Sequence, residues 1–280
     1  MARQPAQREE RLTMTSENRY VRLIERLFLD RHQPGLKTVE FLRTDIESLA
    51  QTLRLELPRN LGDLIYTFRY RTALPDSISR TAPPGSVWVI RSTGRAKYCF
   101  SLTTQANIAP NPALLKIKIP DATPGVVASY ALGDEQALLA KLRYNRLIDV
   151  FTGVVCYSLQ NHLRTTVKSI GQVETDEIYV GVDRQGAHYV LPVQAKGGRD
   201  KISVVQIEQD LAMCGEKFPQ LICRAIGAQF MDGDVIALLE FCISEGQIAV
   251  AQERHYELVS SEDISPADLR QYGQNSAGPA

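Results

Sequence analysis

Hydrophobic periodicity predicts several short helices and one hairpin in the front half of the chain. "SENRYVRLIERLFLDRH" has apolar residues at helical spacing behind Ser16, a residue type that caps helices. "KTVEFLRTDIESLAQTLRLEL" predicts one or two more helices, with Thr44 and Glu47 at capping-box spacing. "PRNLGDLIYTFRYRTAL" predicts a third short helix. After "PPG", the segment "SVWVIRSTGRAKYCFSL" alternates on both sides of a turn, which indicates a β-hairpin.

Three short helices followed by a hairpin is the order of a winged helix-turn-helix. In such a fold the last helix and the hairpin meet DNA phosphates, and both carry basic residues here. The candidate DNA-binding residues are Arg59, Arg69, Arg71, Arg91, Arg95 and Lys97. We therefore expect a basic winged-helix-like DNA-binding domain over residues 14–130. Polar, aperiodic stretches at 1–13 and 271–280 predict disordered tails.

The rear half, residues 131–270, has a different pattern. "DEQALLAKLRYNRLIDVFTGVVCYSLQNHLRTTV" has apolar spacing that fits a long helix, with a break at Gly153 as an option. A hairpin follows in "QVETDEIYVGVDRQGAHYVLPVQAK", then a helix in "KISVVQIEQDLAMCGEKF". Two apolar strands flank the "DGD" turn of "LICRAIGAQFMDGDVIALLEFCI". This order predicts an α/β domain with a mixed, buried central sheet flanked by helices.

Charge and cysteine content narrow the classes of function. The net charge of the chain is zero, but residues 1–130 hold 19 Lys and Arg against 12 Asp and Glu, and residues 131–280 hold 13 against 20. This asymmetry indicates that the front half faces a polyanion. Five scattered cysteines show no metal-ligand spacing. We find no apolar run of membrane-spanning length and no leader, so we expect a cytoplasmic protein without a membrane partner.

The rear hairpin places charges beside apolar residues. On its second strand Gln194 and Lys196 share a face; on its first strand Glu174 and Asp176 share a face, with Glu177 opposite. A carboxylate beside an amide oxygen and an ammonium suits Mg²⁺, which prefers oxygen ligands. A lysine at such a site can orient or deprotonate the attacking water. The alternative is an ordinary edge hairpin with solvated charges.

The segment "ETDEIYVGVD…YVLPVQAK" resembles the core of the PD-(D/E)XK nuclease superfamily, which has the restriction-endonuclease-like fold. The resemblance covers about residues 134–245. It implies that Asp176 is the first acid, that Gln194 stands where the family has a second acid, and that Lys196 is the catalytic lysine. The metal would be Mg²⁺, with Mn²⁺ as a substitute, held by Asp176, Gln194 and the carbonyl of Ala195.

The glutamine departs from the family pattern and removes one negative charge from the metal site. Glu174 and Glu177 could compensate, and Glu177 competes with Asp176 as the ligand. The resemblance also implies supporting residues on the flanking helices, for which Asp149 and Gln206 are the candidates. Cutting of double-stranded DNA generally needs two such sites, so we expect a homodimer.

The sequence therefore predicts a metal-dependent DNA endonuclease of the restriction type. Three alternatives stay open. A structure-selective repair or resolvase-type nuclease shares the same core. A non-catalytic DNA-binding protein with a decayed nuclease site is favoured by Gln194. A structural protein without a DNA role would neither bind nor cut DNA.

Overall fold

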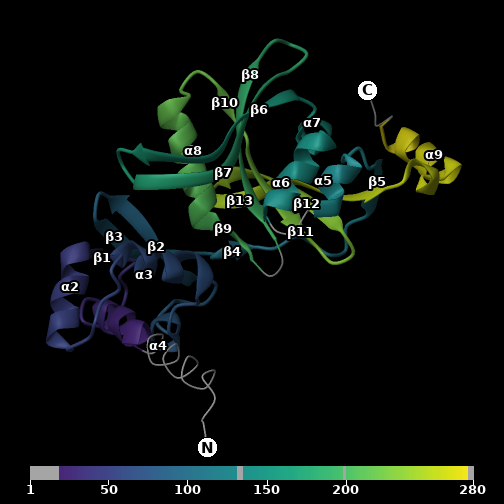
Figure 1. Cartoon of the computed structure of the whole chain (residues 1–280). Helices are drawn as coiled ribbons and strands as arrows, with labels where there is room; N and C mark the ends of the chain where they lie inside the picture. Colours follow the sequence, from purple (N-terminus) through teal and green to yellow (C-terminus); the bar gives the residue numbers. More distant parts are fainter. Residues whose placement is uncertain (1–18, 131–134, 198–199, 277–280) are drawn as a thin grey trace, which may run out of the picture. The chain divides into compact units, whose positions relative to one another are not determined.

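A computed structural model describes residues 19–130, 135–197 and 200–276 of the 280-residue chain. The chain divides into two compact units (Figure 1). The first spans residues 1–106 together with 166–172, and the second spans 107–165 and 173–280. The division thus falls at residue 106 and not at the expected residue 130, and residues 107–130 belong to the second unit.

The first unit contains short helices and a three-stranded antiparallel sheet of order β1-β3-β2. Its described part opens with a helix over residues 19–29, and the Ser16 expected to cap it lies outside the described residues. The remaining elements are β1 (Thr38–Leu42), α2 (Arg43–Thr52), α3 (Leu61–Tyr66), the π-helix η1 (Thr67–Arg71), α4 (Asp76–Ser79), β2 (Val87–Gly94) and β3 (Lys97–Thr103). The expected last helix and hairpin are both present.

One segment of this unit differs from the expectation. Residues 38–42, expected to be helical, form strand β1, in which Val39 and Phe41 are buried and their neighbours are exposed. Because β1 pairs with β3 as a strand, successive side chains point to opposite faces, and every second one is buried. Helix α2 starts only after Leu42, whose N–H donates to Asp45 Oδ2 at 2.7 Å, so the expected capping box from Thr44 is wrong.

The second unit is built on a large mixed sheet of order β5-β13-β12-β11-β8-β7-β6, with β10 also pairing with β8. Strand β8 runs antiparallel to β7 and parallel to β11. The strands are β4 (Asn107–Ile108), β5 (Lys116–Pro120), β6 (Val155–Val167), β7 (Gly171–Val182), β8 (His188–Lys196), β9 (Ile202–Ser203), β10 (Ile222–Cys223), β11 (Ala225–Phe230), β12 (Val235–Ser244) and β13 (Gln247–Val259). The helical elements are α5 (Gly125–Tyr130), α6 (Glu135–Tyr144), α7 (Leu147–Thr152), α8 (Val204–Lys217), η2 (Ser261–Asp263) and α9 (Pro266–Ser276).

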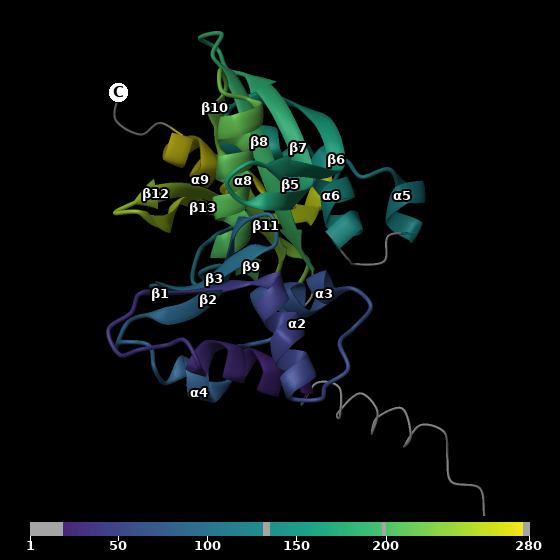
Figure 2. The same ribbon diagram turned by 90° about the vertical axis from the view of Figure 1, so that its left-hand side faces the viewer.

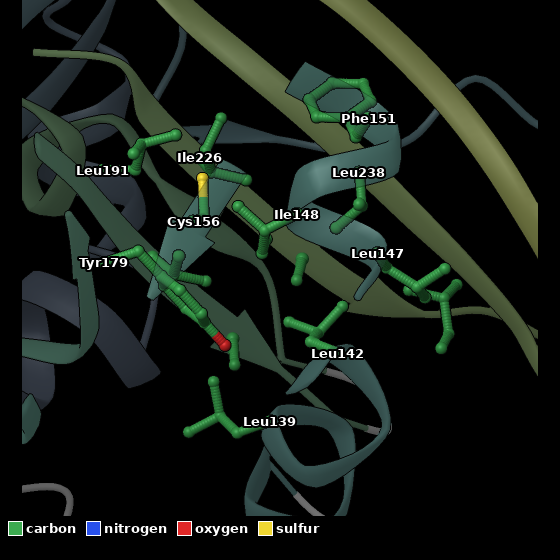
Figure 3. Packing of buried hydrophobic residues seen from close by; sticks show 14 of the residues in the cluster. Leu139, Leu142, Leu147, Ile148, Phe151, Cys156, Tyr179, Leu191, Ile226 and Leu238 are labelled. Atoms are coloured by element: carbon green, nitrogen blue, oxygen red, sulfur yellow. The ribbon is translucent and has the colours of Figure 1, made fainter. Parts of the chain in front are cut away.

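Helices cover both faces of the sheet. Apolar side chains of α6 and α7 pack on one face, against Tyr179, Leu191 and Ile226 (Figure 3). Helix α8 lies on the other face (Figures 1 and 2). The expected mixed α/β class is therefore confirmed, and the described part of the chain has no helix that is long and apolar enough to cross a membrane.

The long helix expected from residue 134 is corrected to two helices and a strand. Arg146, with φ of 50°, separates α6 from α7, and Gly153, with φ of 69°, ends α7. Both residues have the left-handed conformation, which a continuous helix excludes. Beyond Gly153 the chain forms β6, where Val155 and Tyr157 are exposed and Cys156 is buried.

The C-terminal segment also differs from the expectation. Residues 266–276 form α9, so residues 271–276 are helical and not a disordered tail. The hydroxyl of Tyr272 accepts a hydrogen bond from the backbone N–H of Lys118 at 3.0 Å, which ties α9 to β5. The expected tails at 1–13 and 277–280 lie outside the described residues.

Candidate active site

Asp176 and Lys196 meet at the end of the β7–β8 hairpin. The regular β7–β8 pairing reaches Glu177 and Val193. Beyond that point the Asp176 side chain bonds to strand β8, since its Oδ2 accepts the backbone N–H of Ala195 at 2.8 Å. The same Oδ2 lies 3.7 Å from Lys196 Nζ. Both side chains are largely buried, with exposed fractions of 15% and 9%, so this ion pair is shielded from solvent.

A second carboxylate reaches the same lysine. Glu135, in the first turn of α6, lies 3.2 Å from Lys196 Nζ through its Oε1. Burial raises the pKa of Glu135, while the charge of Lys196 opposes that shift. The expected supporting acid was Asp149, so Glu135 was missed. Its signal in the sequence was an acid at the start of the helix that precedes the hairpin.

Gln194 lies in a buried polar network on the α8 side of the sheet. Its Nε2 donates to Asp210 Oδ2 at 2.9 Å and to the carbonyl oxygen of Glu174 at 3.3 Å. The other carboxylate oxygen of Asp210 accepts the hydroxyl of Thr175. Gln194, Thr175 and Asp210 all have no exposed surface. Burial raises the pKa of Asp210 to about 7.

The carbonyl oxygen of the Gln194 side chain, Oε1, is buried and has no hydrogen-bond partner among the described residues. Its neighbour across the parallel ladder is Gly227, and a side chain at that position would collide with Ile202 and Phe241. The flank of Gln194 on β11 is therefore apolar. A buried acceptor without a donor costs about 1–3 kcal/mol, so this oxygen calls for an explanation.

Glu177 has a different environment from Asp176. Its side chain is completely buried, and its Oε1 lies 2.9 Å from Arg143 Nε and also accepts the hydroxyl of Ser158. The described contacts of Glu177 thus go to α6 and β6 and not to Lys196. This arrangement is that of a structural ion pair.

Three further residues of the rear half were expected at the site, and each has its own environment: Glu174, Asp149 and Gln206. The Glu174 side chain pairs with Arg164 on the surface, and only its backbone carbonyl meets Gln194. Asp149 pairs with Arg146 and accepts the backbone N–H of Cys156 at 2.9 Å, which joins α7 to β6. Gln206 is half-buried on α8, one turn before Asp210 and on the same helix face.

The six basic residues of the first unit fall into two groups. Arg69 donates to the carbonyl of Ile90 at 3.2 Å and Arg91 donates to Ser101, so both are used within the unit. The remaining four are exposed and sit before α3, at the end of η1 and around the β2–β3 turn: Arg59, Arg71, Arg95 and Lys97.

The oxygen atoms near Lys196 fit a magnesium ion better than a metal whose ligands all come from protein side chains. Among the described residues, no group of three or more His, Cys, Asp or Glu side chains could hold a metal ion. Mg²⁺, however, commonly uses one or two carboxylates and completes its shell with water and phosphate oxygens. Asp176 and Glu135 supply two carboxylates at Lys196, and Gln194, two residues earlier on β8, has a buried side-chain oxygen without a donor.

Searches for relatives of this chain returned no matching family model, no matching curated protein and no matching solved structure.

Proposed function

We propose that this protein is a metal-dependent DNA endonuclease that hydrolyses phosphodiester bonds, most simply of the restriction type. The observation that carries the proposal is the meeting of Asp176 and Lys196, 3.7 Å apart, on adjoining strands of a buried sheet. An acid and an ammonium contribute nothing to the packing of an apolar sheet. Burial of both charges costs free energy unless they are well paired or have a function.

The residues take separate parts in the proposed reaction. Asp176 and Glu135, with Gln194 Oε1, would hold Mg²⁺, which when bound supplies a more acidic water and charge stabilisation at the phosphate. Lys196 orients the attacking water and offsets the negative charge of the phosphate. The low exposure of Lys196 strengthens these interactions because bulk water is largely excluded.

Binding to double-stranded DNA is assigned in this proposal to the first unit. Its helix-then-hairpin order and β1-β3-β2 sheet support a winged-helix-like arrangement. The four exposed basic residues offer phosphate contacts. Cutting of both strands would need two copies of the active site, so the proposed enzyme acts as a homodimer.

A second candidate is a non-catalytic DNA-binding protein with a decayed nuclease site. The observation that favours it is the neutral Gln194, which donates to Asp210 where the resemblance leads one to expect a metal-ligating acid. Such a protein would bind DNA with a steep salt dependence and cut nothing.

Cleavage assays separate the two candidates. Supercoiled plasmid and phage DNA are incubated with the wild-type protein in Mg²⁺, Mn²⁺ or EDTA, beside Lys196→Ala and, as a matched exposed-lysine control, Lys116→Ala. The proposal predicts metal-dependent cutting that Lys196→Ala abolishes and Lys116→Ala retains. Salt-sensitive binding without any cutting by the wild type would instead support the decayed site.

A further inference from the structure

The amide of Gln194 is held in one orientation by its neighbours. A primary amide has two N–H donors, and both are used here, one by Asp210 Oδ2 at 2.9 Å and one by the carbonyl of Glu174 at 3.3 Å. Both partners are acceptors, so the nitrogen and not the oxygen must lie on that side. The orientation leaves Oε1 as a buried acceptor with no described partner.

Asp210 is itself fixed, because each of its two carboxylate oxygens accepts a hydrogen bond. Its Oδ2 accepts from Gln194 and its Oδ1 accepts from Thr175, and all three side chains are fully buried. A carboxylate with both oxygens engaged in this way is suited to orient a neighbour and not to bind a ligand directly. Gln194, in contrast, is two residues before Lys196 at the end of β8, where the Asp176 carboxylate bonds to the backbone of Ala195.

We propose that Asp210 is a positioning residue that fixes the Gln194 amide so that Oε1 serves as the neutral cation ligand of the site. This inference rests on the proposed function, because it assumes that the Asp176 site takes Mg²⁺ or Mn²⁺. It explains both the buried acid on α8 and the unpartnered oxygen on β8 by one arrangement. The glutamine is then a working ligand held by an acid outside the metal site.

The test measures Mn²⁺ binding to the DNA-free, full-length protein by calorimetry, with urea unfolding of each variant as the measure of stability. Asp210→Asn replaces the charged acceptor by a neutral amide that can accept or donate, so the Gln194 amide is held less firmly and Mn²⁺ binding is expected to weaken about 10- to 100-fold, the usual effect of losing a residue that orients a ligand. Gln194→Met removes the ligand oxygen and is expected to weaken binding as much. Asp183→Asn is the matched control, since Asp183 braces the β7–β8 turn through Gln185, Ala187 and Tyr189.

The double variant Gln194→Glu/Asp210→Asn reverses the polarity of the pair, because the amide introduced at position 210 can donate to the carboxylate introduced at position 194. It keeps the hydrogen bond between positions 194 and 210, loses the one to the Glu174 carbonyl, and puts a carboxylate in place of the neutral ligand, so Mn²⁺ should bind about 10-fold more tightly than to wild type. A purely structural pair would make this variant more stable than Asp210→Asn alone without any gain in affinity over wild type. The double variant keeps the proposal testable even where Asp210→Asn alone does not fold.

The outcomes separate this inference from the proposed function. If Asp176→Asn abolishes Mn²⁺ binding but Asp210→Asn or Gln194→Met leaves it unchanged, the positioning role of Asp210 is overturned. The metal site at Asp176 then stands. An affinity of the double variant equal to that of wild type also overturns the positioning role. Absence of Mn²⁺ binding by the wild-type protein overturns both.

Discussion

Asp176 and Glu177 are adjacent on β7, yet their side chains have different partners and different exposure. Glu177 has no exposed surface, and its contacts are with Arg143 and Ser158. Asp176 keeps 15% of its side chain exposed and shares the Lys196 ammonium with Glu135, which comes from a different element. The comparison shows that burial and partner, not residue type, divide a structural carboxylate from a candidate ligand.

The largest expected effect is at Asp176. Asp176→Asn removes one of the two carboxylates near Lys196, while the amide oxygen can still accept the N–H of Ala195. We expect DNA cleavage to fall about 10²- to 10⁴-fold, the range for loss of an essential catalytic group. Single-turnover cleavage measures this change. DNA affinity in Ca²⁺ and the urea midpoint should stay close to wild type, and a large loss of either would assign Asp176 a structural role.

Glu177→Gln should act on stability instead. Removing one partner of a fully buried ion pair costs about 3–5 kcal/mol, but Arg143 is one-third exposed, so a loss of about 2–3 kcal/mol in the free energy of unfolding is expected. Urea denaturation followed by circular dichroism measures it. Unchanged stability together with lost cleavage would move Glu177 from the structural group to the site.

Glu135→Gln should have an intermediate effect on catalysis. The variant removes a carboxylate that lies 3.2 Å from Lys196 Nζ and keeps Asp176, and we expect about 10-fold slower cleavage with a higher Mg²⁺ requirement. A Mg²⁺ titration of the cleavage rate gives both values. Glu208→Gln, on α8, is a control of the same chemistry, and an equal effect of the two variants would deny Glu135 a specific role.

The smallest effect is expected in the first unit. Lys97→Ala removes one exposed charge at the β2–β3 turn, so DNA affinity should fall modestly and the slope of log affinity against log salt should decrease by about 1. Fluorescence anisotropy at several salt concentrations measures it, with Lys116→Ala as the control. The cleavage rate at saturating DNA should not change. A salt slope equal to that of wild type would remove Lys97 from the DNA-binding surface.

The hairpin at the centre of the site could be predicted from the sequence because its signals are local. "YVGVD" and "HYVLPVQAK" alternate about a turn, and the structure has β7, β8 and then α8 in the expected places. The expectation that Gln194 and Lys196 share a face rests on the period of a strand. The specific superfamily fold and the activity stay predictions.

The missed features depend on contacts between distant segments. Strand β6 was expected to be helical because apolar residues near Phe151, Val155 and Leu159 fit either period, and only pairing with β7 decides between them. Strand β1 needs β3, a distant segment of the chain, to become a strand. Glu135 lies 61 positions before Lys196, and only the packing of α6 on the sheet brings it there.

The most direct test of the account compares the two adjacent acids in one assay. Asp176→Asn and Glu177→Gln are assayed for Mg²⁺-dependent plasmid cleavage beside wild type, at a temperature where circular dichroism shows all three folded. The account predicts that Glu177→Gln cuts at nearly the wild-type rate and that Asp176→Asn cuts at least about 100-fold more slowly. Cleavage by Asp176→Asn at a rate close to that of wild type, or loss of cleavage in folded Glu177→Gln, would contradict it.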